Sequence, residues 1–88
     1  MRTIYKYDLV IGYNTLYLPD QHKVIHVGEQ YGNLTMWVEQ PPMQHSAGAH
    51  TFQVYGTGHQ ITDDRAVHVG TALMNSGLVW HVYEMKNG

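Results

Sequence analysis

A two-residue alternation of apolar and polar side chains runs through most of this sequence and limits what the chain can fold into. Side chains of a β-strand point alternately to its two faces, so this alternation gives each strand one face for the core. Nowhere do apolar residues recur at the three-and-four spacing of a helix over ten residues or more. The sequence therefore predicts an all-β domain.

We expect six or seven mostly antiparallel strands, arranged as a small sandwich or a partly open barrel. The segments with the clearest alternation are residues 3–9, 15–18, 23–30, 34–40, 50–56, 66–73 and 78–84. Turns rich in Gly and Asn are predicted at residues 12–14, 31–33 and 75–77. Residues 41–49 contain two prolines and several small residues, and they are predicted to form a mobile loop.

The alternation also predicts which side chains face the core. In the fourth segment Leu34, Met36 and Val38 form the natural core face, which leaves Trp37 on the opposite face. In the fifth segment Phe52 and Val54 share one face, and Tyr55 lies on the other. An outward Trp37 needs a partner, either another layer of the same domain or another protein.

The length, composition and charge of the chain limit the class of protein to which it can belong. The 88 residues are predicted to form a single domain over residues 1–88, with a thin core, because a chain of this size buries only about 60 to 65% of its surface. A hydrophobic content of 43% with 14% charged residues excludes a disordered chain. The five scattered basic residues offer no strip for phosphates, so no direct nucleic-acid contact is expected.

Two further absences in the sequence suggest where the protein works. No segment approaches the roughly 20 apolar residues of a membrane helix, and the N-terminus lacks the apolar centre of a signal peptide. The chain contains no cysteine, which excludes disulfides and thiolate metal sites. We expect a cytoplasmic protein with no membrane contact.

The stretch VYGTGHQITDD, residues 54–64, holds the densest group of polar and glycine residues. A dinucleotide loop needs a third glycine and a following helix, and a P-loop also needs a Gly-Lys pair; all are missing here. Gly56 and Gly58 are therefore predicted to end a strand and form a turn, with exposed amides for a ligand as the alternative. His59 either caps this turn or faces a ligand.

Seven histidines raise the possibility of a metal site, but their spacing is poor for one. No two histidines stand at i and i+2, and the nearest pairs are His22 with His26, His45 with His50, and His59 with Asp63. His81, between Trp80 and Val82, is interpreted as a hydrogen-bonded packing residue. We predict no bound metal and no cofactor.

Catalytic motifs are also missing. There is no cysteine nucleophile, Ser46 and Ser76 lie outside any G-x-S-x-G motif, and Asp63 and Asp64 are neighbours whose side chains point apart. The sequence is therefore interpreted as that of a non-enzymatic protein. Seven tyrosines and two tryptophans then stand out, because Tyr and Trp are typical anchors of protein interfaces.

The candidate partner-binding or ligand-binding residues combine these aromatics with the glycine-rich turn. They are Trp37, Tyr55, Gly56, Gly58, His59 and Trp80.

The segments IYKY, LYLP, HVGEQYGNLTMWV, YGTGH and GLVWHVYE together resemble a family of small uncharacterised proteins found mostly in bacteriophages and prophages. The resemblance covers roughly residues 3–84, and Gln60 departs from the proline expected after His59. It implies a phage protein that acts in the host cytoplasm. Small phage domains of this kind often block host proteins, so the resemblance suggests an inhibitor of a defence complex, such as an anti-CRISPR protein.

The leading functional hypothesis is a protein-binding module that inhibits or modulates a host protein or protein complex. The main alternative is a protein that binds or sequesters a small ligand such as a nucleotide signal, either within one chain or at the interface of a homo-oligomer. Two further alternatives remain open, a metal site built around His59 and a structural role in the virion.

Overall fold

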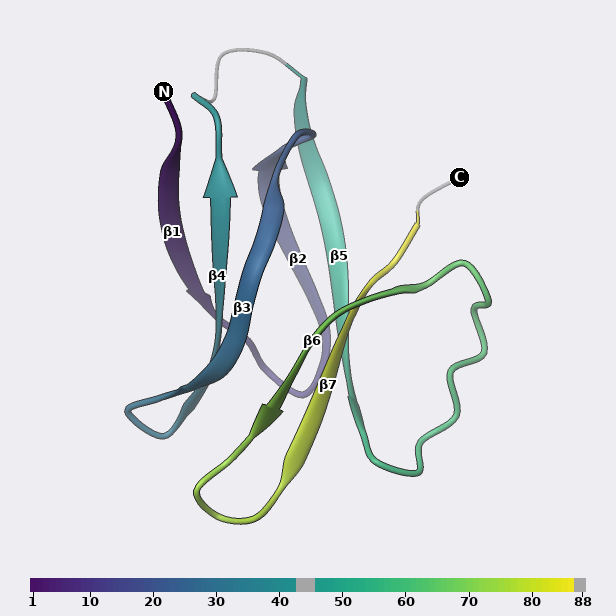
Figure 1. The fold of residues 1–88 in the computed structure, drawn as a ribbon. Helices are drawn as coiled ribbons and strands as arrows, with labels where there is room; N and C mark the ends of the chain where they lie inside the picture. Colours follow the sequence, from purple (N-terminus) through teal and green to yellow (C-terminus); the bar gives the residue numbers. More distant parts are fainter. Residues whose placement is uncertain (43–45, 87–88) are drawn as a thin grey trace.

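The structure is a computed structural model that describes residues 1–42 and 46–86 (Figure 1). Within these residues it contains seven strands and no helix, so no helix that could cross a membrane is found there. The strands are β1 (Thr3–Asp8), β2 (Gly12–Pro19), β3 (Lys23–Gln30), β4 (Asn33–Gln40), β5 (Ala47–Gly56), β6 (Val67–Leu73) and β7 (Val79–Glu84). The all-β prediction is confirmed.

The strands form two antiparallel sheets that face each other, one of three strands in the order β1-β4-β3 and one of four in the order β2-β5-β7-β6. Between them lies a single layer of apolar side chains. Its fully buried members include Leu18, Met36, Val38, Phe52 and Val82. The predicted core face of β4 and the inward direction of Phe52 and Val54 are confirmed.

The two sheets approach each other most closely where β3 lies beside β6. A methyl group added to Gly70 on β6 would stand 2.4 Å from Val27 Cγ2 on β3, so only glycine fits here. Each of these strands also shifts register once, between Val24 and His26 in β3 and between His68 and Gly70 in β6. The fold is therefore a sandwich in which the edge strands β3 and β6 are in close contact.

Two predicted boundaries are wrong. Residues 12–14 do not form a turn, because β2 already starts at Gly12 and the chain reverses at Leu9–Ile11 instead. There the side chain of Asn14 accepts a hydrogen bond from the backbone N–H of Val10 and donates one to the carbonyl of Val10. These two bonds hold the reversal between β1 and β2. The predicted mobile loop is also too long, since β5 begins at Ala47; its residues 43–45 lie outside the described part of the chain.

The predicted turns of the other two hairpins are confirmed. Tyr31 and Gly32 connect β3 to β4 with φ angles of 52° and 82°, the positive pair that a tight two-residue hairpin turn requires. Gly77, in the turn between β6 and β7, has a φ of 94°. Glycine accepts this conformation without steric cost, which explains the Asn-Ser-Gly sequence there.

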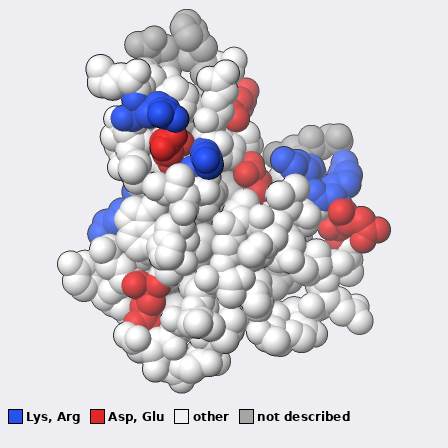
Figure 2. Space-filling view, viewed as in Figure 1, with Lys and Arg blue, Asp and Glu red and all other residues white. Residues whose placement is uncertain are grey.

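Ion pairs between exposed side chains contribute little to holding this fold together. Arg2 Nη1 lies 2.7 Å from Glu39 Oε1, and Arg65 Nε lies 3.4 Å from Asp63 Oδ1. Figure 2 shows Lys and Arg beside Asp and Glu in small groups, with uncharged surface between them. Exposed pairs of this kind add at most about 1 kcal/mol each, so stability rests mainly on the apolar layer.

The contact between β3 and β6 gives a test of the packing. Gly70→Ala should lower the free energy of unfolding by about 1–3 kcal/mol, because the new methyl group overlaps Val27. Gly48→Ala is the matched control, since a methyl group there meets nothing within 4 Å. Urea unfolding followed by circular dichroism measures both, and equal midpoints for the two variants would contradict the described packing.

Candidate functional site

The turn after β5 brings together the glycines and the histidine of the predicted site. The backbone N–H of Gly56 donates to His59 Nδ1 at 2.9 Å, and the N–H of His59 donates to the carbonyl of Gly56 at 3.1 Å. Gly58 lies between them with a φ of 93°. His59 therefore caps this turn through Nδ1, as the first of its two predicted roles requires.

Gly56 is needed for a different reason than Gly58. A methyl group at Gly56 would lie 3.1 Å from His59 Cε1 and 3.3 Å from the ring of Trp80, so the glycine is enclosed by the two rings. Trp80 pairs with Gly56 across β5 and β7 and packs against the core. The sequence-predicted residues Gly56, His59 and Trp80 line one hollow of about 490 Å³, together with Thr57, Gly77, Leu78 and Val79.

A second hollow, of about 210 Å³, lies beside the same turn and is lined by Tyr55, Gly56, Thr57, Gly58, His59, Ile61, His81 and Tyr83. His81 is hydrogen-bonded, as predicted: its Nε2 lies 2.9 Å from Thr57 Oγ1 and its Nδ1 lies 3.0 Å from Thr71 Oγ1. Thr71 Oγ1 is also 2.8 Å from His68 Nε2. These contacts fix the orientation of the His81 imidazole in the wall of the hollow.

Two ionisable groups near this hollow have shifted pKa values. Burial raises the pKa of the Tyr55 phenol, and the nearby charges of Tyr13, Asp63 and Tyr83 raise it further. The backbone N–H of Arg65 lowers the pKa of Asp63, and its guanidinium adds to the effect. Near neutral pH Tyr55 is therefore a hydrogen-bond donor, to Gln53 Oε1 at 3.1 Å, and Asp63 is a carboxylate.

Trp37 lies apart from the other predicted residues. It belongs to β4, on the outer face of the three-stranded sheet, and pairs across the sheet with Lys6 on one side and His26 on the other. Its ring centroid is 5.5 Å from that of His26, and the side chain is half-buried. The outward side chain of Trp37 is thus covered in part by neighbouring side chains of its own sheet.

The outer face of the four-stranded sheet is the tyrosine-rich surface of the domain, and we call it the tyrosine face. The register places one row of outward side chains across all four strands, Tyr13, Gln53, Tyr83 and His68. Tyr13 is 67% exposed and Tyr17, four residues along β2, is 66% exposed. Between these two tyrosines lies Thr15, which pairs with Thr51 across the sheet, and both threonines have smaller side chains than the tyrosines.

No Asp, Glu, Lys or Arg occurs among the outward side chains of the described strands β2, β5, β6 and β7. These positions hold Tyr13, Thr15, Tyr17, Pro19, Ala47, Ala49, Thr51, Gln53, Tyr55, His68, Thr71, Leu73, Val79, His81 and Tyr83. Two exposed apolar residues, Val10 and Ile11, lie directly before the start of β2. Apart from histidines, the outward strand positions of the tyrosine face are thus uncharged, and the carboxylate of Asp63 in the following loop lies near it beside Tyr55.

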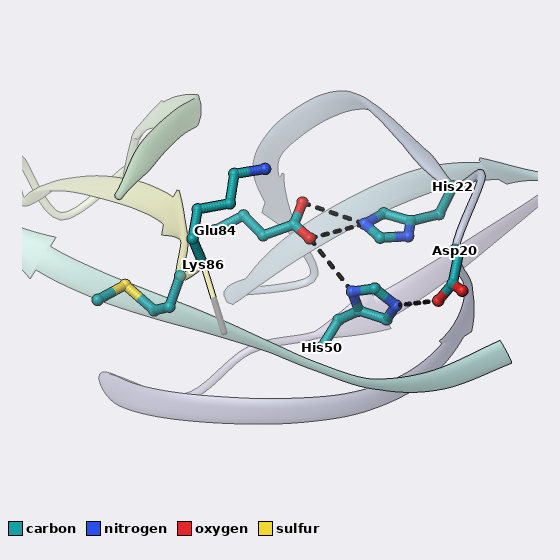
Figure 3. A pocket seen from close by; sticks show the side chains of 6 residues that line it. Asp20, His22, His50, Glu84 and Lys86 are labelled. Atoms are coloured by element: carbon teal, nitrogen blue, oxygen red, sulfur yellow. Dashed lines mark hydrogen bonds and ion pairs between the residues drawn. The ribbon is translucent and has the colours of Figure 1, made fainter. Parts of the chain in front are cut away.

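A third group of polar residues lies at the other end of β5 and faces inward. His22, His50 and Glu84 converge so that one ligand atom from each lies within 4.8 Å of the others (Figure 3). Asp20 joins the group through His50 Nε2, at 3.1 Å. These residues line a hollow of about 320 Å³ together with Met85 and Lys86.

A comparison with known protein families identifies the family of this chain. The model of the family described as Domain of unknown function (DUF7352) matches residues 1–88. The chain belongs to this family. No curated protein and no solved structure matches the chain. The family description assigns no activity, so the functional argument for this DUF7352 domain rests on its geometry.

Sequence reasoning did not find the group of His22, His50 and Glu84 in this DUF7352 domain. The pairs that it considered were close in sequence, whereas His22 and Glu84 are separated by 62 residues. One signal was available: His50 and Glu84 stand two residues from the core residues Phe52 and Val82, on the inward face of their strands. Polar side chains at core-facing positions need partners, and they therefore point to a buried polar group.

The cap formed by His59 can be tested by substitution. His59→Ala should lower the free energy of unfolding by about 0.5–1.5 kcal/mol, because the N–H of Gly56 loses its acceptor. His59→Asn keeps an acceptor on a short side chain and should restore part of this loss. Hydrogen exchange at the Gly56 amide gives a local readout, and unchanged protection in His59→Ala would contradict the cap.

Proposed function

We propose that this domain is a non-enzymatic protein-binding module whose binding surface is the tyrosine face. The observation that carries the proposal is the exposure of Tyr13 and Tyr17 on a sheet face without Asp, Glu, Lys or Arg. Tyr side chains supply large and stiff contact area at low entropic cost, and charged residues are depleted at the centres of protein interfaces. Both properties favour a protein partner for this surface.

The size of the domain is compatible with an ordinary interface. A standard interface buries about 800 Å² on each partner, which is roughly one seventh of the 5681 Å² that this domain exposes. The Cα positions extend over 39 × 31 × 15 Å, so the outer sheet faces are the broad surfaces of a flat molecule. One broad face therefore has room for such a contact.

The edge of the same sheet supports the proposal. β2 pairs with β5 and is the end strand of its sheet, so one side of its backbone has no strand partner in the sheet order. An extended segment of another protein can add to such an edge through main-chain hydrogen bonds. Tyr13 and Tyr17 would then lie next to the added strand and provide its side-chain specificity.

The resemblance to phage and prophage proteins directs the choice of partner to host proteins. Under this proposal the domain covers a functional surface of its target and so inhibits or modulates it, as an anti-CRISPR protein does with a defence complex. The tyrosine face lacks fixed charges, so recognition would depend on shape and aromatic contact instead of imitation of nucleic acid.

Substitution of the two tyrosines tests the proposal. Tyr13→Ser and Tyr17→Ser should each weaken binding to an identified host partner by at least about tenfold, the loss expected for an interface anchor worth 1.4 kcal/mol or more. The partner is captured from host lysate with the natural sequence, identified, and measured against purified variants by biolayer interferometry.

Tyr31→Asn is the matched control, because Tyr31 is 90% exposed but lies in the turn between β3 and β4. Binding that falls equally in all three variants, or in none, would rule out the tyrosine face as the binding surface. Light scattering of the free protein separates a host partner from a second copy of the chain, since self-association through this face should also respond to Tyr13→Ser.

A second candidate function is the binding of a small ligand beside Trp80. The hollow lined by Gly56, His59 and Trp80 has a volume of about 490 Å³, within the roughly 300–1,000 Å³ of known ligand pockets. A nucleotide base stacked on Trp80 would change the fluorescence of that residue. In Trp37→Phe, Trp80 is the remaining tryptophan, so titration of this variant with a panel of nucleotides should give a saturable change. A signal that stays flat for every nucleotide would exclude this class of ligand.

A further inference from the structure

The group of His22, His50 and Glu84 joins three segments that are far apart in sequence. His50 comes from β5, Glu84 ends β7, and His22 belongs to the short connection that carries the chain from β2 in one sheet to β3 in the other. The rings of His22 and His50 meet edge to face with centroids 4.4 Å apart, and His22 also contacts the ring of Phe52. The group therefore closes one end of the apolar layer.

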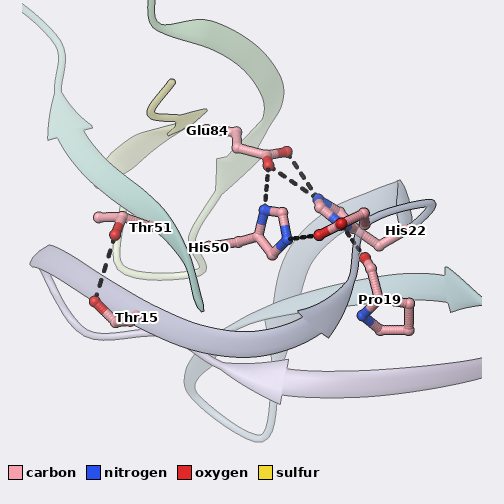
Figure 4. A network of polar contacts seen from close by, with 7 residues as sticks. Thr15, Pro19, His22, His50, Thr51 and Glu84 are labelled. Carbon is pink, nitrogen blue, oxygen red and sulfur yellow. Dashed lines mark hydrogen bonds and ion pairs between the residues drawn. The ribbon is translucent and has the colours of Figure 1, made fainter. Parts of the chain in front are cut away.

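The imidazole of His22 has a defined hydrogen position. Its Nδ1 atom lies 2.7 Å from the carbonyl oxygen of Pro19, which can only accept, so Nδ1 carries a hydrogen (Figure 4). In the neutral ring Nε2 then presents a lone pair. That lone pair faces the carboxylate of Glu84, whose oxygens are 3.0 and 2.9 Å away. The side chain of His22 is only 5% exposed, so water has little access to it.

The imidazole of His50 is held in the same way but with its nitrogens exchanged. Its Nε2 atom lies 3.1 Å from Asp20 Oδ1, closer than Nδ1 lies to Glu84 Oε2 at 3.4 Å, so we place the single hydrogen of the neutral ring on Nε2. Nδ1 then directs its lone pair to Glu84. In this arrangement three electron-pair donors lie within 4.8 Å of one another.

The distances among these three donors suit neighbouring ligands of one cation. Metal–ligand bonds of about 2.0–2.2 Å in a tetrahedral site place adjacent ligand atoms about 3.3–3.6 Å apart. Glu84 lies 2.9 Å from His22 Nε2 and 3.4 Å from His50 Nδ1, and all three ligand atoms lie within 4.8 Å of one another. A shift of about 1 Å or less in the side chains is sufficient to bring them around one ion. The outer contacts fit as well, because metal-binding histidines usually donate their other N–H to a carboxylate or a backbone carbonyl.

We propose that His22 Nε2, His50 Nδ1 and the carboxylate of Glu84 bind a divalent transition-metal ion of the zinc class. Two imidazoles and one carboxylate are ligands typical of zinc and its neighbours in the first transition row, whereas calcium and magnesium prefer oxygen alone. Asp20 and the carbonyl of Pro19 are positioning groups that orient the two imidazoles. This site is independent of the tyrosine face.

Three protein ligands leave at least one coordination position for water or an anion. The adjoining hollow of about 320 Å³ provides the space for it, and Lys86 lines that hollow. An ammonium group beside a metal disfavours a second cation and favours an anionic ligand. The open position is therefore suited to a small anion such as a carboxylate or phosphate group.

The test is titration of the metal-free full chain, without a histidine tag, at pH 7.5. Isothermal calorimetry with zinc chloride should show one equivalent bound, and cobalt chloride should give the visible absorption bands of a four- or five-coordinate site. Glu84→Gln and His22→Ala should each weaken binding by at least about a hundredfold, and Asp20→Asn by about 10–100-fold, as for other residues that orient a ligand.

His68→Ala is the matched control because His68 is an exposed histidine on another part of the surface. It should still bind one equivalent with unchanged affinity. Binding that falls equally in His68→Ala and Glu84→Gln would indicate adventitious histidine contacts and overturn the proposal.

Failure of the natural sequence to take up zinc or cobalt would also overturn it. If Glu84→Gln or His22→Ala is unfolded by circular dichroism, Asp20→Asn and the cobalt spectrum of the natural sequence decide, because Asp20 is largely exposed.

Discussion

The single layer of apolar side chains between the two sheets is the constraint on which the rest of this molecule depends. Phe52, Met36 and Val38 are fully excluded from solvent, and each strand supplies the layer with alternate residues only. Every other side chain must lie on an outer face or at an end of the sandwich. A small domain of this kind therefore presents about half of its strand residues outward, and their chemistry decides what it can bind.

The two outer faces differ because of the residues that fill these outward positions. On the three-stranded sheet Trp37 is half-buried between its cross-strand neighbours Lys6 and His26. On the four-stranded sheet Tyr13 and Tyr17 lie on either side of Thr15 along the edge strand β2 and remain exposed. Aromatic content alone did not distinguish these surfaces, whereas the neighbours of each aromatic residue do.

Polar groups lie at both ends of the apolar layer, where the apolar contacts stop. β5 carries both groups: His50 near its start belongs to the histidine and glutamate group, and Gly56 at its end belongs to the turn capped by His59. Six residues of strand separate these positions by about 20 Å. Phe52 and Val54 are buried between them. The two ends are therefore separate chemical environments on one rigid element.

Much of the fold was predictable from sequence because alternation reports directly on strands that have one buried face. The core faces of β4 and β5 and the turns at Gly32 and Gly77 followed from local chemistry. The start of β2 did not, because Gly12 and Asn14 are typical turn residues, yet their backbone pairs with β5 while the side chain of Asn14 binds the backbone of Val10 in the preceding reversal.

The candidate sites were less predictable because they depend on register. Gly56, His59 and Trp80 were found since two of them are close in sequence and belong to a recognisable motif. His22 meets His50 and Glu84 only after the strand order is known, and no local pattern encodes that order. The exposure of Tyr13 relative to Trp37 likewise depends on which strands lie at the edge of each sheet.

The strand order also affects the sequence in which the strands pair during folding. Of the five strand pairings, two join strands that are consecutive in the sequence, β3 with β4 and β6 with β7, while the pairings of β1, β2 and β5 close longer loops. Hairpins form within microseconds, whereas domains dominated by distant pairings fold in milliseconds to seconds. We expect the two hairpins to form first and the others to follow. The connection that carries His22 then reaches its partners only in the late steps, when β5 and β7 have paired.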